Sequence, residues 1–167
     1  MTARLATARD LPMLELICND PSIRLWSAFD GAPPSKPSGY LRGGSFIVIC
    51  EQDGNVVGCF PSKRMEPGVF SVHACLLPNG RANSELHARD AMSLAFGGMM
   101  ADRLTAGIPT SCPHAAMIAR RIGFGRLFRI EGLWPSGGRM HDIDIFAIDR
   151  ETWEGVTTNP TQEYSHA

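Results

Sequence analysis

The chain has 167 residues, of which 44% are hydrophobic and 20% are charged, and its formal net charge is -1. This size and composition suit one globular domain with a single core. A nearly neutral chain gives no electrostatic reason to expect a nucleic acid or an anionic membrane as a partner. No apolar run approaches the roughly 20 residues that span a bilayer. Because Met1 to Asp10 is also polar, we expect a cytoplasmic protein.

The five cysteines are scattered along the chain, and none of them forms a Cys-x-x-Cys pair: they are Cys18, Cys50, Cys59, Cys75 and Cys112. Most lie in apolar strings, which predicts buried free thiols in a reducing compartment rather than disulfides or a zinc site. The five histidines show no metal-ligand spacing. The sequence therefore predicts no metal site.

The first third of the chain predicts one strand, two helices and a long loop. Ala3 to Ala6 is the strand candidate, Asp10 precedes the first helix, and Asn19-Asp20-Pro21 separates it from the second. Residues 31–44 contain three prolines and four glycines. Loops of this length in compact domains are often functional, although a solvated connector explains this one equally well.

The middle of the chain predicts three strands followed by a helix. Ser45 to Cys50 and Val56 to Phe60 flank a hairpin turn signal, and Val69 to Leu77 is apolar enough to lie near the centre of a sheet. From Ser84 the apolar period becomes helical. Gly97-Gly98 allows either close packing on the sheet or fraying of that helix.

The last third predicts the order strand, helix, strand, strand. These elements are Leu104 to Ile108, a helix with Pro113 at its first position, Phe124 to Trp134, and Met140 to Ile148. We expect residues 1–153 to form one domain and residues 154–167 to form a polar tail. Strands mixed with spaced helices predict a mixed α/β domain of two or three layers.

Several short strings in this order resemble the GNAT family of acetyl-CoA-dependent N-acetyltransferases. The strings are Arg4 to Pro12, Leu77-Pro78-Asn79-Gly80-Arg81, Ile122-Gly123-Phe124, and Asp142 to Ile148 with Glu151 and Trp153. The resemblance implies an α/β fold with a mixed, mostly antiparallel central sheet and about four flanking helices. It is closest to GNAT-like proteins of tailed bacteriophages, some of which are linked to head assembly.

The same resemblance implies where acetyl-CoA would bind. It assigns cofactor contacts to Leu76, Leu77, Arg81, Ala82, Asn83, Ser84 and Cys112. The family holds the pyrophosphate on free N–H groups at a helix N-terminus, and small residues let the phosphates approach. Here Ser84 and Leu86 replace the two small positions, and Glu85 adds a negative charge. Asn83 or Ser84 is a normal N-cap for an empty helix terminus.

The groups that move protons also differ from the family pattern. The strand Val69 to Leu77 contains no carboxylate, so His73 is the candidate general base, although a lone histidine in an apolar strand is more often a hydrogen-bonded core residue. Neither of the two tyrosines lies in the fourth helix, where the family often places the proton donor. Cys112 precedes Pro113 at a helix N-terminus, which could lower the pKa of its thiol; a Cys112–His114 nucleophile pair is conceivable.

These departures support two hypotheses. The first is a GNAT fold with a degenerate acyl-CoA site that serves binding or assembly with other protein subunits, for example in a bacteriophage virion. The alternative is an active N-acetyltransferase that acts on a small amine or a protein amine. An open gap between Val69–Leu77 and Leu104–Ile108, lined by free N–H groups, would favour the enzyme. A gap filled by side chains such as Leu86 would favour the degenerate site.

Overall fold

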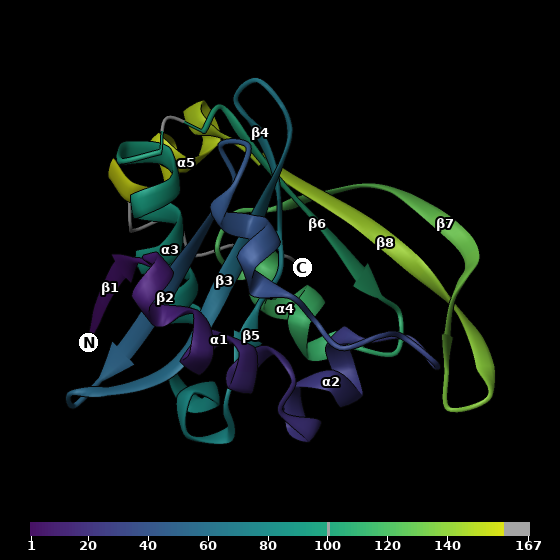
Figure 1. The fold of residues 1–167 in the computed structure, drawn as a ribbon. Coiled ribbons are helices and arrows are strands. Elements are labelled where there is room, and N and C mark those ends of the chain that lie inside the picture. Colours follow the sequence, from purple (N-terminus) through teal and green to yellow (C-terminus); the bar gives the residue numbers. More distant parts are fainter. Residues whose placement is uncertain (100, 159–167) are drawn as a thin grey trace.

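The computed structural model describes residues 1–99 and 101–158 (Figure 1). It contains an eight-stranded sheet with five α-helices. The strands are β1 (Thr2–Leu5), β2 (Phe46–Gln52), β3 (Asn55–Glu66), β4 (Val69–Val72), β5 (Cys75–Leu76), β6 (Arg103–Pro109), β7 (Gly125–Ser136) and β8 (Arg139–Asp149). The helices are α1 (Leu11–Cys18), α2 (Pro21–Ser27), α3 (Ser84–Gly97), α4 (Pro113–Arg121) and α5 (Arg150–Thr158). The mixed α/β fold class is confirmed.

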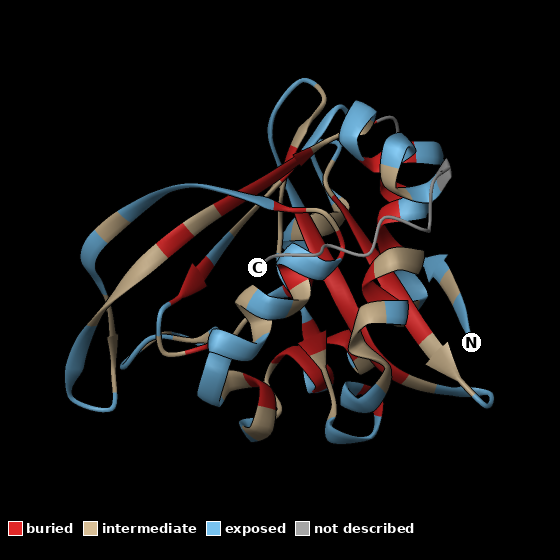
Figure 2. Cartoon of the chain, turned by 180° about the vertical axis from the view of Figure 1, so that it is seen from behind, coloured by how far each residue is buried: buried red, intermediate tan, exposed pale blue. Residues whose placement is uncertain are grey.

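The sheet is covered on both faces, and strand β2 shows why. Its residues alternate between two hydrophobic cores, as side chains of a strand point to opposite faces in turn. Phe46, Val48 and Cys50 pack with α3, α4 and α5, whereas Ile47 and Ile49 pack with α1 and α2. The buried residues therefore gather in the central strands between two layers of helices (Figure 2).

The strand order is β1-β2-β3-β4-β6-β8-β7, and β5 pairs with β3. Among the described strands, β4 and β6 form the one parallel pair, which ends at Ser71 and Thr105. Beyond that point β6 continues beside β8, whereas β5 stays beside β3. The two central strands therefore diverge, and the sheet opens in its middle.

Gly58 allows β5 to lie this close to β3. A Cβ atom at this position would come within 2.4 Å of the Cys75 carbonyl oxygen and 2.9 Å of the Leu76 Cα. Both contacts are with backbone atoms, so neither could be relieved by rotating a side chain. The absence of a Cβ at Gly58 thus permits the pairing that holds β5 away from β6.

The hairpin of β7 and β8 extends beyond the helices (Figure 1). Leu127, Phe128 and Leu133 on β7 are more than half exposed. The two strands are joined by ion pairs from Arg126 and Arg129 to Asp144, at 2.9 and 2.8 Å. Hydrogen bonding from Arg129 lowers the pKa of Asp144, so this pairing persists in mild acid.

Three elements differ from the sequence-based expectation. The strand expected over Val69–Leu77 is interrupted at residues 73–74. Helix α3 ends at Gly97, and a Cβ there would meet nothing within 4 Å, so the glycine pair ends the helix rather than packing on the sheet. Helix α5 occupies the start of the expected tail because Trp153 is buried against Phe96. The remainder of that tail, residues 159–167, lies outside the described residues.

The Gly31–Gly44 loop packs against the rest of the chain. The Asn19 side chain exchanges hydrogen bonds with the backbone of Ser35 at 2.7 and 3.0 Å, and Arg24 donates to the Ala32 carbonyl at 2.6 Å. The loop contains the 3-10 helix η2 (Pro37–Leu41), whose Tyr40 packs against the core under α1. No helix in the described ranges combines the length and apolarity needed to cross a membrane.

Candidate functional site

A cleft of about 550 Å³ lies where the central strands diverge. One wall is formed by Val72, His73, Ala74 and Leu76 and the other by residues Ala106–Pro109; we call these facing segments the strand end of the cleft. The cleft continues to the turn before α3, where it is lined by Arg81, Ala82, Ser84 and Glu85; we call residues 78–85 the loop end. Helices α2 and α4 also contribute to the lining.

The strand end contains an unpaired backbone donor. His73 N–H donates to the Pro61 carbonyl and Leu77 N–H donates to the Val57 carbonyl, each at 2.9 Å. Because peptide groups alternate in direction along a strand, the N–H of Ala74 points the other way, toward β6. The β4–β6 ladder has ended by then, and within the described residues the Ala74 N–H has no hydrogen-bond partner. It therefore faces the cleft as a free donor.

His73 lies next to this donor on the cleft wall. It is solvent-accessible, and no hydrogen bond to its ring occurs within the described part of the chain. The expectation of a hydrogen-bonded core histidine is therefore wrong, since the strand interruption turns this position toward the cleft. Surrounding protein desolvates the ring and lowers the pKa of His73 below its ordinary 6.5. The imidazole is thus neutral at pH 7 and can accept a proton.

The loop end is built differently, because its polar groups bond to the protein itself. Arg81 donates to the Leu76 carbonyl at 3.2 Å and to the Ser22 carbonyl at 2.8 Å. It thereby ties β5 to the start of α2. The turn is a 3-10 helix, η3 (Pro78–Asn83), that runs directly into α3, and the Ser84 N–H bonds to the Arg81 carbonyl. The start of α3 therefore has fewer free N–H groups than an isolated helix terminus.

The expected N-cap at this turn is absent. Asn83 holds the N-cap position of α3 but makes no capping hydrogen bond. Its side-chain amide instead donates to the Gln52 side chain at 3.1 Å. The charge of Glu85 is paired with Arg89 at 3.1 Å, one helical turn later. The negative charge expected beside a phosphate is thus largely offset.

Cys112 and two aromatic residues form the wall near α2 and α4. Cys112 donates from Sγ to the Trp26 carbonyl at 3.7 Å, and the Trp26 and His114 rings meet edge to face at 5.7 Å. Burial raises the pKa of the Cys112 thiol, so the expectation of a lowered pKa is wrong. His114 faces Trp26, and the structure does not bring it together with the Cys112 thiol as a nucleophile pair.

Most of the residues that the sequence assigned to this site do line the cleft: His73, Leu76, Arg81, Ala82, Ser84 and Cys112. Leu77 packs under α1 instead, and Asn83 bonds to Gln52. Leu86 is 47% exposed and lies outside the cleft lining, so of the two alternatives the gap is open and Leu86 does not plug it. The sequence analysis did not identify Trp26, Ala74 and Trp134 as site residues. No pattern in the neighbouring sequence indicates them, because only the fold brings them to the cleft.

Comparison with known proteins gives matches in structure alone. No family model matches the chain, and no curated protein sequence matches it. The ribosomal-protein-alanine N-acetyltransferase from Brucella melitensis superposes with a TM-score of 0.73 at 20% identity, covering 89% of this chain and 99% of that one. The spermidine N-acetyltransferase from Vibrio cholerae, solved with CoA and spermine, gives a TM-score of 0.77 at 12% identity over 92% and 97% of the two chains.

These identities are too low to carry an activity from one protein to another. The coverage is nearly complete in both directions. The chain therefore has the fold of the GNAT N-acetyltransferases.

Proposed function

We propose that this protein is an N-acetyltransferase that binds acetyl-CoA in the cleft and transfers the acetyl group to an amine. One observation carries the proposal: the central strands splay around an open cleft, and the free Ala74 N–H faces it. A buried or plugged gap would have left no room for a thioester. Of the two hypotheses drawn from the sequence, we therefore prefer the active N-acetyltransferase to the degenerate acyl-CoA site.

The strand end supplies the groups that acyl transfer needs. When an amine attacks the thioester carbonyl, negative charge develops on its oxygen, and a preorganised N–H stabilises that charge. Ala74 provides such a donor. The neutral His73 ring takes the proton that the attacking amine loses as the C–N bond forms. The C–S bond then breaks and CoA leaves as a thiolate. Among the described residues that line the cleft none is a tyrosine, so we assign the proton that the thiolate takes up to solvent.

The acceptor would enter beside α2, where the lining is aromatic. Trp26, His114 and Trp134 line this part of the cleft. Glu85, at the loop end, is the one carboxylate among the described lining residues, and it is paired with Arg89. Binding of a polycation would call for several carboxylates. We therefore favour an acceptor with a single amino group, either a small amine or a protein amine.

A second candidate function rests on Arg81. Its guanidinium is already bonded to two main-chain carbonyls, and the Ser84 N–H is used within the turn. Both observations favour a degenerate cofactor site in a protein that serves binding or assembly with other subunits, including the bacteriophage virion role that the sequence resemblance suggests. The two candidates differ in whether acetyl-CoA binds.

Thermal unfolding with increasing acetyl-CoA separates them. A ligand at 100 times its Kd stabilises the native state by about 2.7 kcal/mol, so a saturable rise in Tm supports the enzyme. Ala74→Trp should block the cleft and abolish the rise. Ala8→Trp, at another exposed alanine outside the cleft, is the matched control. No shift in the wild type would reject the proposal and leave the degenerate site.

Release of the CoA thiol in the presence of single-amine and polyamine acceptors then tests the reaction. We expect turnover with single amines and little with polyamines. Binding of acetyl-CoA without turnover of any amine in a broad panel would contradict the catalytic part of the proposal.

A further inference from the structure

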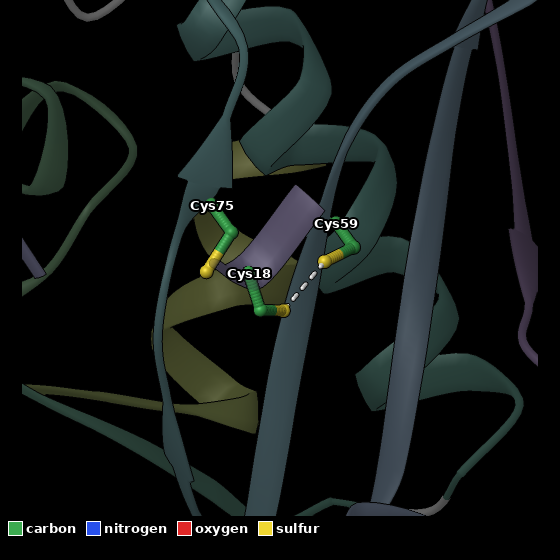
Figure 3. Close-up of side chains that lie close together, drawn as sticks. All are labelled: Cys18, Cys59 and Cys75. Atoms are coloured by element: carbon green, nitrogen blue, oxygen red, sulfur yellow. Dashed lines mark hydrogen bonds between the residues drawn. The ribbon is translucent and has the colours of Figure 1, made fainter. Parts of the chain in front are cut away.

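Three buried cysteine side chains lie close together in the core under α1. Cys18 ends α1, Cys59 lies in β3 and Cys75 begins β5. Their sulfur atoms all lie within 4.8 Å of one another, and the Cys18 and Cys59 Sγ atoms are 3.8 Å apart. Figure 3 shows the Cys18 and Cys59 sulfur atoms directed toward each other, with the Cys75 side chain beside them. Each residue is at most 6% exposed.

This spacing matches what a bound cation requires. Zn–S bonds of about 2.3 Å in tetrahedral geometry place two sulfur ligands about 3.8 Å apart. The Cys18–Cys59 pair already has that separation. The distances from the Cys75 Sγ to the other two sulfur atoms would have to shorten by at most about 1 Å. Rotation of the side chains can supply this change. The three ligands come from three different elements, so the site is assembled by the fold.

Hydrogen bonding within the cluster affects the three thiols unequally. Hydrogen bonds from Cys59 and Cys75 lower the pKa of Cys18, and the hydroxyl of Ser35 adds to this effect. The same hydrogen bonding, together with burial, raises the pKa of Cys59 and of Cys75. The other titratable groups that face the cluster are Tyr40 from η2 and His73 from the strand break. No carboxylate interacts with the cluster among the described residues.

We propose that Cys18, Cys59 and Cys75 form a binding site for a thiophilic d10 cation, of the class of Zn²⁺ or Cu⁺. Thiolates select these cations over harder ones. Binding breaks the remaining S–H bonds, releases those protons to solvent and forms three metal–sulfur bonds, with no change in oxidation state. The bound cation would join the end of α1 to β3 and β5, and so would brace one side of the cleft.

The first test measures metal binding by the reduced, full-length protein. Zn²⁺ and, in a separate anaerobic arm, Cu⁺ are titrated in competition with a chromophoric chelator. We expect one equivalent of metal per chain, proton release and a higher Tm. Binding of Cu⁺ alone would identify a three-coordinate site, and binding of Zn²⁺ would identify a site that adds a fourth ligand. Absence of stoichiometric binding in both arms would overturn the proposal.

Variants assign the ligands. Cys18→Ser, Cys59→Ser and Cys75→Ser should each weaken binding by more than about 100-fold, because loss of outer-shell partners alone weakens metal binding by about 10- to 100-fold. Cys50→Ser, at a buried thiol in the other core, is the matched control. This variant should bind the metal with the affinity of the wild type. Unchanged affinity in all three cluster variants would also overturn the proposal.

A labelling experiment avoids variants that fail to fold. The wild-type protein is alkylated at thiols under mild denaturant with and without the metal, and each cysteine is read by mass spectrometry. We expect the metal to protect Cys18, Cys59 and Cys75 at least tenfold more than Cys112. Equal protection of all five cysteines would contradict a site at this cluster.

Discussion

The two ends of the cleft place similar polar groups in opposite situations. At the strand end, the Ala74 N–H has lost its neighbour because β6 turns away, and the His73 ring is neutral and accessible. At the loop end, Arg81 and the Ser84 N–H bond to backbone carbonyls of the chain. A donor that the fold leaves unpaired can serve a ligand, whereas a donor already paired must first give up its partner.

In the proposed reaction this difference would separate catalysis from anchoring. The strand end would polarise the carbonyl and remove a proton. At the loop end Arg81 holds β5 against α2, which would leave fewer groups free for a phosphate. We therefore expect changes at the strand end to lower the rate of acetyl transfer, and changes at the loop end to alter stability and affinity.

The largest effect is expected for His73→Gln. Loss of a general base lowers kcat by about 10²- to 10⁴-fold, whereas the Tm shift with acetyl-CoA should remain. Desolvation lowers the pKa of His73 below 6.5, so the wild-type kcat/KM should be flat near pH 7 and fall as the ring protonates at lower pH. That acidic limb should be absent in the variant. His141→Gln, on β8 outside the cleft lining, is the control; equal rates for both variants would remove His73 from the mechanism.

The next effect is expected for Ala74→Pro, which deletes the free N–H. Removal of one donor of this kind lowers kcat by about 10²- to 10³-fold. Ala74→Gly keeps the N–H and serves as the matched variant in the same steady-state assay. If the proline variant turned over as fast as the glycine variant, the Ala74 amide would have no part in the reaction.

Arg81→Ala tests the loop end and should act mainly on stability. Loss of two charge-assisted hydrogen bonds should lower the free energy of unfolding by about 1–3 kcal/mol, as measured by urea denaturation. We expect the Kd for acetyl-CoA to weaken by less than about tenfold, that is by less than about 1.4 kcal/mol. Arg42→Ala, at an exposed arginine outside the cleft, is the control. A large loss of affinity with unchanged stability would show that Arg81 serves the ligand after all.

The smallest effect is expected for Glu85→Gln. It removes an i,i+4 ion pair with Arg89, which contributes about 0.2–0.5 kcal/mol. The Arg89 charge near the loop end is then no longer offset by a carboxylate, although its guanidinium still donates to the Arg121 carbonyl at 2.9 Å. Acetyl-CoA should bind slightly more tightly in low salt, and the gain should vanish at high salt because screening removes it. Calorimetric titration of acetyl-CoA at the two salt concentrations measures the gain in affinity and its loss. Weaker binding in low salt would mean that Glu85 itself helps to hold the ligand.

Local patterns predicted most of the elements because each depends on nearby residues. Asp53-Gly54-Asn55 forms the predicted turn between β2 and β3. Pro113 begins α4, and Gly123 follows that helix with a φ of +102°, a conformation that side chains other than glycine rarely adopt. The missed element, α5, is polar apart from Trp153 and Val156. Its formation depends on burial of Trp153 against Phe96, a contact across more than 50 positions of sequence.

The candidate site could be predicted only in part. The sequence identified His73 as the titratable group on the central strand, but it favoured a core position, since an apolar neighbourhood in sequence does not reveal a strand break. It identified Arg81 but could not show that the Ser22 carbonyl would bind it. The cysteine cluster was hidden for the same reason, because Cys18, Cys59 and Cys75 have no shared spacing along the chain.

The sequence by itself determined the order of strands and helices, because hydrophobic period, turn residues and helix caps act over a few neighbours. The tertiary structure alone decided which groups remain free. The pairing of β5 with β3 rather than β6, permitted by Gly58, opens the cleft and leaves the Ala74 N–H without a partner. Whether a backbone donor is free depends on what lies beside it in space, and no local pattern records that.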